Sequence, residues 1–192
     1  AEAHRRGETL YGVDTRLPLH PPVLSEGAAS LLPGHLRPAL LWCIELDAQG
    51  EITRVDVRRA VVRSHARLDY AGVQQALDAG TANPLWTVLR EIGGLRATRE
   101  QARGGISLAL PEQEIDVVDG QCRLSYRVNH PIEDWNAQIS LLTGMAAAQL
   151  MVQGKLGLLR TLPPPEDDAI ARLRLTAQAL RIAWPPAQPY PE

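Results

Sequence analysis

The order of apolar and polar residues along the chain predicts two β-hairpins. Residues 39–46 are mostly apolar and lead into the turn residues Asp47 to Gly50, and residues 52–62 follow with Ile and Val in near alternation with polar residues. Alternation with a period of two is typical of a half-buried strand, so this stretch predicts the first hairpin. The second is predicted at residues 114–118 and 121–128, because Asp119-Gly120 is typical of a two-residue hairpin turn.

Apolar residues at helical spacing predict four helices, at residues 70–79, 85–102, 131–152 and 169–182. Gly93-Gly94 predicts a bend in the second, because each glycine costs about 1 kcal/mol relative to alanine inside a helix. The third is so rich in apolar and small residues that we expect it to be buried nearly all round. Asp167 or Asp168 is expected to cap the fourth.

Two shorter segments complete the expected architecture. Leu24 to Ser30 predicts a helical turn at most, and Leu156 to Arg160 is a candidate strand. Residues 1–192 show no internal repeat and no convincing linker. We therefore expect one α+β unit, in which a mostly antiparallel sheet and flanking helices surround a long buried central helix.

Composition and charge narrow the function. The chain has no Phe. It has 20 Lys and Arg residues and 22 Asp and Glu residues, which gives a net charge of −2. Because the chain is not basic overall, any contact with nucleic acid must be local. Cys43 and Cys122 lie in apolar or strand-like runs and are expected to be buried reduced thiols, which fits the cytoplasm. No stretch has the roughly 20 apolar residues of a membrane span, and residues 1–9 carry no apolar signal region. We expect no membrane partner.

Spacing alone yields no catalytic or metal-binding cluster. The acidic residues and histidines are scattered, and Asp167-Asp168 at a helix start is better explained as a cap than as a metal site. Ser64, His65 and Asp69 lie within six residues, whereas catalytic triads are assembled across a fold. The same segment does place Arg67 and Tyr70 directly after a strand, where cationic and stacking groups could face nucleic acid.

Five short segments in a consistent order resemble those of the ribonuclease II family, whose catalytic region is the RNB domain. Ser64-His65-Ala66-Arg67-Leu68-Asp69-Tyr70 resembles the S-x-A-x-L-x-Y segment of that family, and Arg103-Gly104-Gly105-Ile106-Ser107 resembles its R-G-G-I-S segment. The other three are listed here: Tyr11 with Leu17-Pro18-Leu19-His20-Pro21, Leu24 to Leu31, and the central helix with Met145-Ala146-Ala147-Ala148. The resemblance covers nearly the whole chain.

The resemblance implies part of a 3′→5′ exoribonuclease that hydrolyses single-stranded RNA, not DNA, to nucleoside monophosphates. Water activated by Mg²⁺ would attack, with the metal held by an aspartate cluster that precedes Ala1 in the family. Further RNA-binding parts of the family follow Glu192. The chain would then be a partial RNB-like domain, inactive alone, with no metal ligands of its own.

The resemblance also assigns site residues. Tyr11 matches a tyrosine that stacks near the terminal nucleotides, and Tyr70 matches one in the catalytic cavity. Arg67 is expected to contact RNA because of its own position directly after a strand, close to Tyr70. Three positions depart from the family and are listed here: Ala137-Gln138 replaces a Glu pair, Leu108 replaces an aromatic clamp, and Leu162 replaces the histidine that follows Arg160 in an R-x-H segment.

Two alternatives to the enzyme interpretation stay open. One is a non-catalytic RNB-derived module that binds RNA or a protein partner. The other is a structural fragment whose uncovered apolar faces make it self-associate.

Overall fold

The structure, a computed structural model, describes residues 2–12, 15–108, 110–161 and 163–190. Its helices are α1 (Glu2–Arg6), α2 (Tyr70–Asp78), α3 (Pro84–Ala102), α4 (Pro131–Gly154) and α5 (Asp167–Ala179), with the π-helical turn η1 (Val23–Ala28). Its strands are β1 (Leu10–Tyr11), β2 (Arg16–Leu17), β3 (Leu36–Leu46), β4 (Ile52–Arg63), β5 (Glu112–Val118) and β6 (Gln121–Arg127). The α+β class is confirmed.

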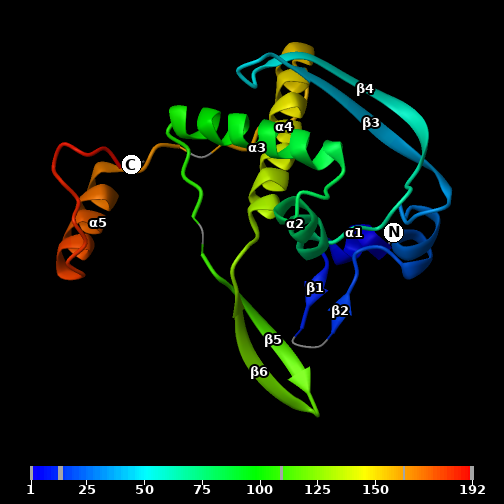
Figure 1. Ribbon diagram of the computed structural model, residues 1–192, viewed down its shortest axis with the longest axis horizontal. Coiled ribbons are helices and arrows are strands. Elements are labelled where there is room, and N and C mark those ends of the chain that lie inside the picture. The colour runs from blue at the N-terminus through cyan, green and yellow to red at the C-terminus, as the bar shows by residue number, and fades with distance from the viewer. Residues whose placement is uncertain (1, 13–14, 109, 162, 191–192) are drawn as a thin grey trace.

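The strands form three separate antiparallel hairpins, β1–β2, β3–β4 and β5–β6, within the described ranges. Antiparallel pairing is as predicted, but the hairpins do not join into one sheet. In Figure 1, β3–β4 arches over one end of α4 while β5–β6 extends from the other end. The two long hairpins therefore lie at opposite ends of α4, and the described strands form neither a barrel nor a sandwich.

The two long hairpins turn as their sequences predict. At the β3–β4 turn, Asp47 Oδ1 accepts hydrogen bonds from the N–H groups of Gln49 at 2.9 Å and Glu51 at 2.8 Å, and Gly50 has a φ of +79°. At the β5–β6 turn, Asp119 and Gly120 have φ values of +53° and +74°. Two successive positive φ angles match the right-handed twist of the strands, which explains the Asp-Gly sequence.

The core lies where α3 crosses α4 (Figure 1). Gly93 of α3 stands against Trp135 of α4, and a Cβ at Gly93 would come within 2.5 Å of the Trp135 Cβ. Gly93-Gly94 does not interrupt α3, which runs unbroken from Pro84 to Ala102, and the bend predicted there stays a prediction. Gly93 allows the close approach of the two helices.

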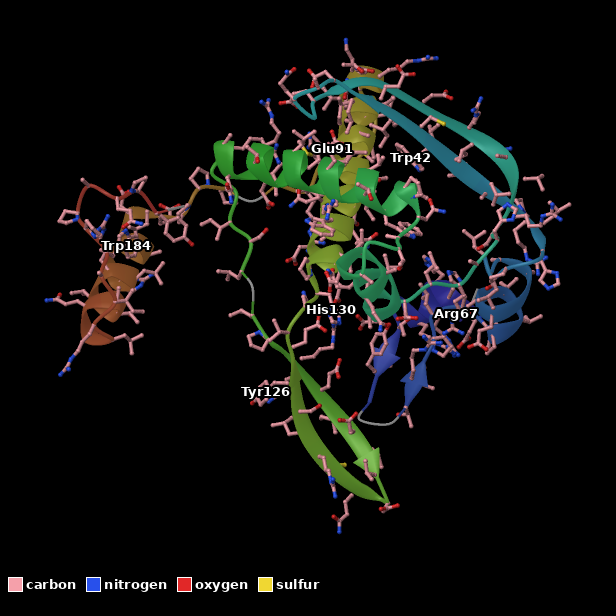
Figure 2. The ribbon with its side chains drawn as sticks, in the orientation of Figure 1. Trp42, Arg67, Glu91, Tyr126, His130 and Trp184 are labelled. Atoms are coloured by element: carbon pink, nitrogen blue, oxygen red, sulfur yellow. The ribbon has the colours of Figure 1, made fainter. Side chains whose placement is uncertain are left out.

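Burial on α4 follows one face. Ile132, Gln138, Leu142 and Ala146 are its buried residues, whereas Val152 is 60% exposed. The expectation that this helix is buried nearly all round is wrong, because α2, α3 and the β3–β4 hairpin contact one side of it. Figure 2 shows Trp42 on the side of β3 that faces α4.

One buried cation fastens the β3–β4 turn to this core. Arg96 of α3 is 1% exposed and donates hydrogen bonds to the Gly50 carbonyl oxygen at 2.7 Å and to the Met145 sulfur at 3.1 Å. Glu51 is 3.7 Å from the same guanidinium and also pairs with Arg99. Burial lowers the pKa of Arg96, and the charge of Arg103 adds to the lowering.

Three smaller expectations are corrected. Leu156 to Arg160 contains no strand. The last helix begins at Asp167 with Glu166 as its N-cap, so Asp167 and Asp168 lie in its first turn and suit the helix dipole. Both cysteines are free, but Cys43 is half-buried and Cys122 is exposed, because no described element covers the β5–β6 hairpin.

Within the described ranges, no helix is both long and apolar enough to cross a membrane.

Candidate functional site

The segment from Ser64 to Tyr70 is a connection that ends β4 and starts α2. The Ser64 hydroxyl donates to the Ala66 carbonyl oxygen at 3.2 Å, and the Ser64 carbonyl oxygen accepts from the Gly34 N–H at 3.1 Å. Asp69 Oδ1 accepts from the Gly72 N–H at 2.8 Å, which caps α2 and places Tyr70 at its first position. Ser64 and Asp69 thus have structural partners and form no triad.

Tyr70 lies at the boundary of two cavities. Its hydroxyl oxygen accepts a hydrogen bond from Asn136 Nδ2 of α4 at 3.0 Å, and 45% of the residue is exposed. On one side is a cavity of about 440 Å³ between α2, α3 and α4, which we call the helix recess. On the other is a cavity of about 990 Å³ along α4, which we call the α4 groove. Tyr70 and Asn136 line both.

The α4 groove follows α4 from the turn before it to Met151. Small residues of α4, among them Gly144, Ala147 and Ala148, line it on one side, and residues 158–161 line it on the other. Arg160 brings a cation to that second wall. Small side chains leave room for a chain-like ligand against the helix, and a guanidinium can bind phosphate in a bidentate manner.

An ionic cluster lies at the end of the groove where α4 begins. Arg127 donates to Glu112 at 2.6 Å, Glu114 at 3.1 Å and Glu133 at 2.7 Å. Hydrogen bonds from Arg127 to Glu133 and then to Glu112 raise the pKa of Arg127. Burial alone would raise the pKa of Glu133, but hydrogen bonds from Arg127 and the His130 N–H outweigh it and lower that pKa. This cluster fixes the β5–β6 hairpin to the start of α4, where Figure 2 labels His130.

A third cavity, of about 510 Å³, lies beside the segment after α3. Gln138 is 8% exposed and donates to Glu100 Oε2 at 2.6 Å, while Ser107 donates to Glu100 Oε1 at 3.1 Å. Leu108 lines this cavity and is 75% exposed. Glu100 and Gln138 therefore hold the Arg103-to-Ser107 segment against α4, a role that the sequence pattern did not reveal.

The structure does not bring all the predicted site residues together. Tyr11 is 77% exposed on β1, opposite Arg16, and Arg67 is exposed in the connection between β4 and α2 (Figure 2). Neither lines the three cavities described above. Leu162 lies outside the described residues.

Asn136 is a site residue that sequence reasoning missed. It holds the Tyr70 hydroxyl, and its position four residues after the buried Ile132 places it on the same face of α4. A polar residue at that spacing among apolar ones was the available signal.

No group of three or more His, Cys, Asp and Glu side chains in the described ranges is arranged to hold a metal ion. The carboxylates of Glu112, Glu114 and Glu133 all pair with the guanidinium of Arg127. The residues that the structure describes therefore do not fit a magnesium site.

Comparison with known proteins gives a family match over almost the full length. The model of the RNB domain family matches residues 1–186. Ribonuclease R of Escherichia coli is 28% identical over 196 residues, which cover 96% of this chain and 24% of that protein. The exosome complex exonuclease RRP44 of Homo sapiens is 27% identical over 177 residues, covering 85% of this chain and 18% of that protein.

The fold agrees with solved structures. Ribonuclease R of Mycoplasma genitalium, solved in complex with ribose-methylated single-stranded RNA, superposes with a TM-score of 0.86 at 24% identity, over 96% of this chain and 30% of that one. The chain spans about a quarter or less of the length of the curated relatives named above.

Proposed function

Because this chain belongs to the RNB domain family, we propose that it is part of a 3′→5′ exoribonuclease that hydrolyses single-stranded RNA to nucleoside monophosphates. Relatives named ribonuclease R and exosome exonuclease support the reaction class. A protein of the same fold has been solved with single-stranded RNA, which supports the substrate. The free cysteines suit the cytoplasm, where thiols stay reduced, and we propose that compartment.

The observation that carries the proposal is the α4 groove with Tyr70 at its edge. An extended RNA strand needs a long channel, an aromatic ring for stacking and a cation for a phosphate. The groove offers small residues along α4, the half-exposed ring of Tyr70 and the guanidinium of Arg160. We propose that the 3′-terminal part of the RNA lies here.

The contribution of this chain to hydrolysis is to hold and orient the strand. Since the described residues do not fit a metal site, we derive no step through Mg²⁺ in this chain. In the proposal, Mg²⁺ and its ligands belong to other parts of a longer parent protein, and the chain alone does not cleave RNA.

The test is decay of 5′-end-labelled single-stranded RNA with Mg²⁺ by the chain in its full natural reading frame and by residues 1–192 alone. We expect only the longer protein to shorten the RNA from its 3′ end, and a DNA oligonucleotide of the same sequence to resist. Loss of one stacked base contact costs about 1–3 kcal/mol, so Tyr70→Ala should weaken RNA binding by roughly 5- to 150-fold.

Tyr126→Ala is the matched control, because Tyr126 is 66% exposed on β6 and does not line the groove. It should leave both binding and cleavage unchanged. If the longer protein binds RNA without ever shortening it, the chain belongs to a non-catalytic binding module and the proposed reaction is wrong.

A further inference from the structure

The helix recess is an apolar cavity of ligand size. Its walls come from Val73 of α2, Trp86 and Leu89 of α3, and Ile132 of α4, and its volume is about 440 Å³. Sites for small organic ligands commonly have volumes of about 300–1,000 Å³ with mostly apolar and aromatic walls. The walls of the recess suit a flat ring that can lie against the indole of Trp86.

Polar atoms line one side of this recess. Asp69 caps α2 through Oδ1 alone, and Asn136 uses its Nδ2 for the Tyr70 hydroxyl. Within the described part of the chain, Asp69 Oδ2, Asn136 Oδ1 and the Tyr70 hydroxyl proton have no hydrogen-bond partner. Two acceptors and one donor are thus available to an occupant.

The recess opens beside the proposed path of the RNA. Tyr70 and Asn136 line both the recess and the α4 groove, so their hydrogen bond forms the boundary between them. A group attached to a strand in the groove needs to pass only this boundary to enter the recess.

We propose that the helix recess binds a nucleobase, and favours bases that carry an exocyclic amino group. The inference rests on the proposed function for the identity of the strand, although base binding itself needs no hydrolysis. The ring lies among Trp86, Leu89 and Val73, its amino group donates to Asn136 Oδ1 or Asp69 Oδ2, and its sugar and phosphate point into the groove. The carboxylate of Asp69 repels phosphate from the recess itself.

The experiment is NMR titration of the 192-residue chain with each of the four ribonucleoside 5′-monophosphates. The indole N–H signal of Trp86 is identified by its loss in Trp86→Phe. We expect AMP, GMP and CMP to shift this signal, UMP to shift it least, and ribose 5-phosphate, which lacks a base, to leave it in place. Trp184, which packs with Arg174 of α5, is an internal reference that should not shift.

Two matched substitutions locate the binding. Leu68 lies at the recess and is 54% exposed, so Leu68→Trp should obstruct the entrance without disturbing the core. Leu124→Trp makes the same change on β6, where the residue is 56% exposed and far along the chain from the recess. In calorimetry, Leu68→Trp should weaken AMP binding at least tenfold, and Leu124→Trp should leave it unchanged.

The outcomes separate this inference from the proposed function. The proposed base site is wrong if none of the four nucleotides shifts the Trp86 signal at millimolar concentration. It is also wrong if ribose 5-phosphate shifts this signal equally, even if the longer protein degrades RNA. If the nucleotides bind as expected but the longer protein never shortens RNA, the base site stands and the proposed hydrolysis falls. An RNA oligonucleotide that competes with AMP would show that bases of the strand use the same recess; failure to compete would restrict the site to free nucleotides and overturn its link to the groove.

Discussion

Arg127 connects the β5–β6 hairpin to α4 through side-chain hydrogen bonds. Its guanidinium donates to Glu112 and Glu114 of the hairpin and to Glu133 of α4, so it joins two elements that share few other contacts. Exposed ion pairs contribute little singly, but a guanidinium shared by three carboxylates restricts geometry. Glu133 is the best shielded of the three, with 11% of its side chain exposed.

The lowered pKa of Glu133 predicts a pH-dependent stability. A carboxylate whose pKa is lower in the folded than in the unfolded state stabilises the fold above its unfolded pKa, and this contribution is lost as pH falls through the folded value. The free energy of unfolding, measured with urea from about pH 7 down to about pH 3, should therefore fall. The fall should occur below about pH 4.3, the ordinary pKa of a Glu side chain. Arg127→Gln should make the free energy of unfolding depend less on pH over this range.

Arg123→Gln is the control for this prediction, because Arg123 lies on the same strand and faces Asp116 across the hairpin. An equal flattening of the pH profile by both substitutions would mean that overall charge, not the contact with Glu133, causes the effect.

At the scale of elements, the crossing of α3 and α4 predicts opposite effects of alanine at neighbouring glycines. A Cβ at Gly93 would lie 2.5 Å from the Trp135 Cβ, whereas nothing lies within 4 Å of a Cβ at Gly94. Gly93→Ala should destabilise the fold by about 1–3 kcal/mol through overpacking. Gly94→Ala should stabilise it by up to about 1 kcal/mol through helix propensity. Denaturant unfolding of the two variants measures both, and effects of the same sign would contradict this packing.

The same elements show what sequence could and could not predict. The turns at Asp47 and Asp119 were predicted because turn chemistry is local, and helix bounds came close because apolar spacing is local too. The role of Gly93 depends on Trp135, a residue 42 positions away, and the pairing of Gln138 with Glu100 depends on how two helices cross. Such contacts carry no signal in the pattern of either segment alone.

For the candidate site, too, sequence reasoning identified some residues and missed others. The resemblance pointed to Tyr70, and the structure places it between two cavities. The resemblance also pointed to Tyr11, and the position of Arg67 after a strand pointed to that residue. Both are exposed, do not line those cavities, and remain predictions as RNA contacts. Asn136 emerged from the fold because its partner lies on another helix.

For the molecule as a whole, the apolar composition suggests a larger buried core than the structure has. Hydrophobic residues make up 45% of the chain, yet the buried apolar residues in the described ranges are Ile132, Leu142, Ala146 and Ala177. Composition counts apolar residues without saying whether elements stack. Here the hairpins extend outward from α4, so Leu40 of β3 and Val61 of β4 are 64% and 68% exposed.

The anchoring of Gly50 by Arg96 has a consequence for the order of folding events. This hydrogen bond joins residues 46 positions apart, and the contact with Met145 joins residues 49 positions apart, whereas each hairpin and helix forms from neighbours. Distant contacts form after local ones because long loops must first close. Arg96→Met should therefore speed unfolding while changing the folding rate little, as stopped-flow rates against urea concentration would reveal. A variant that slows folding and leaves unfolding unchanged would instead place the docking of this turn in the folding nucleus.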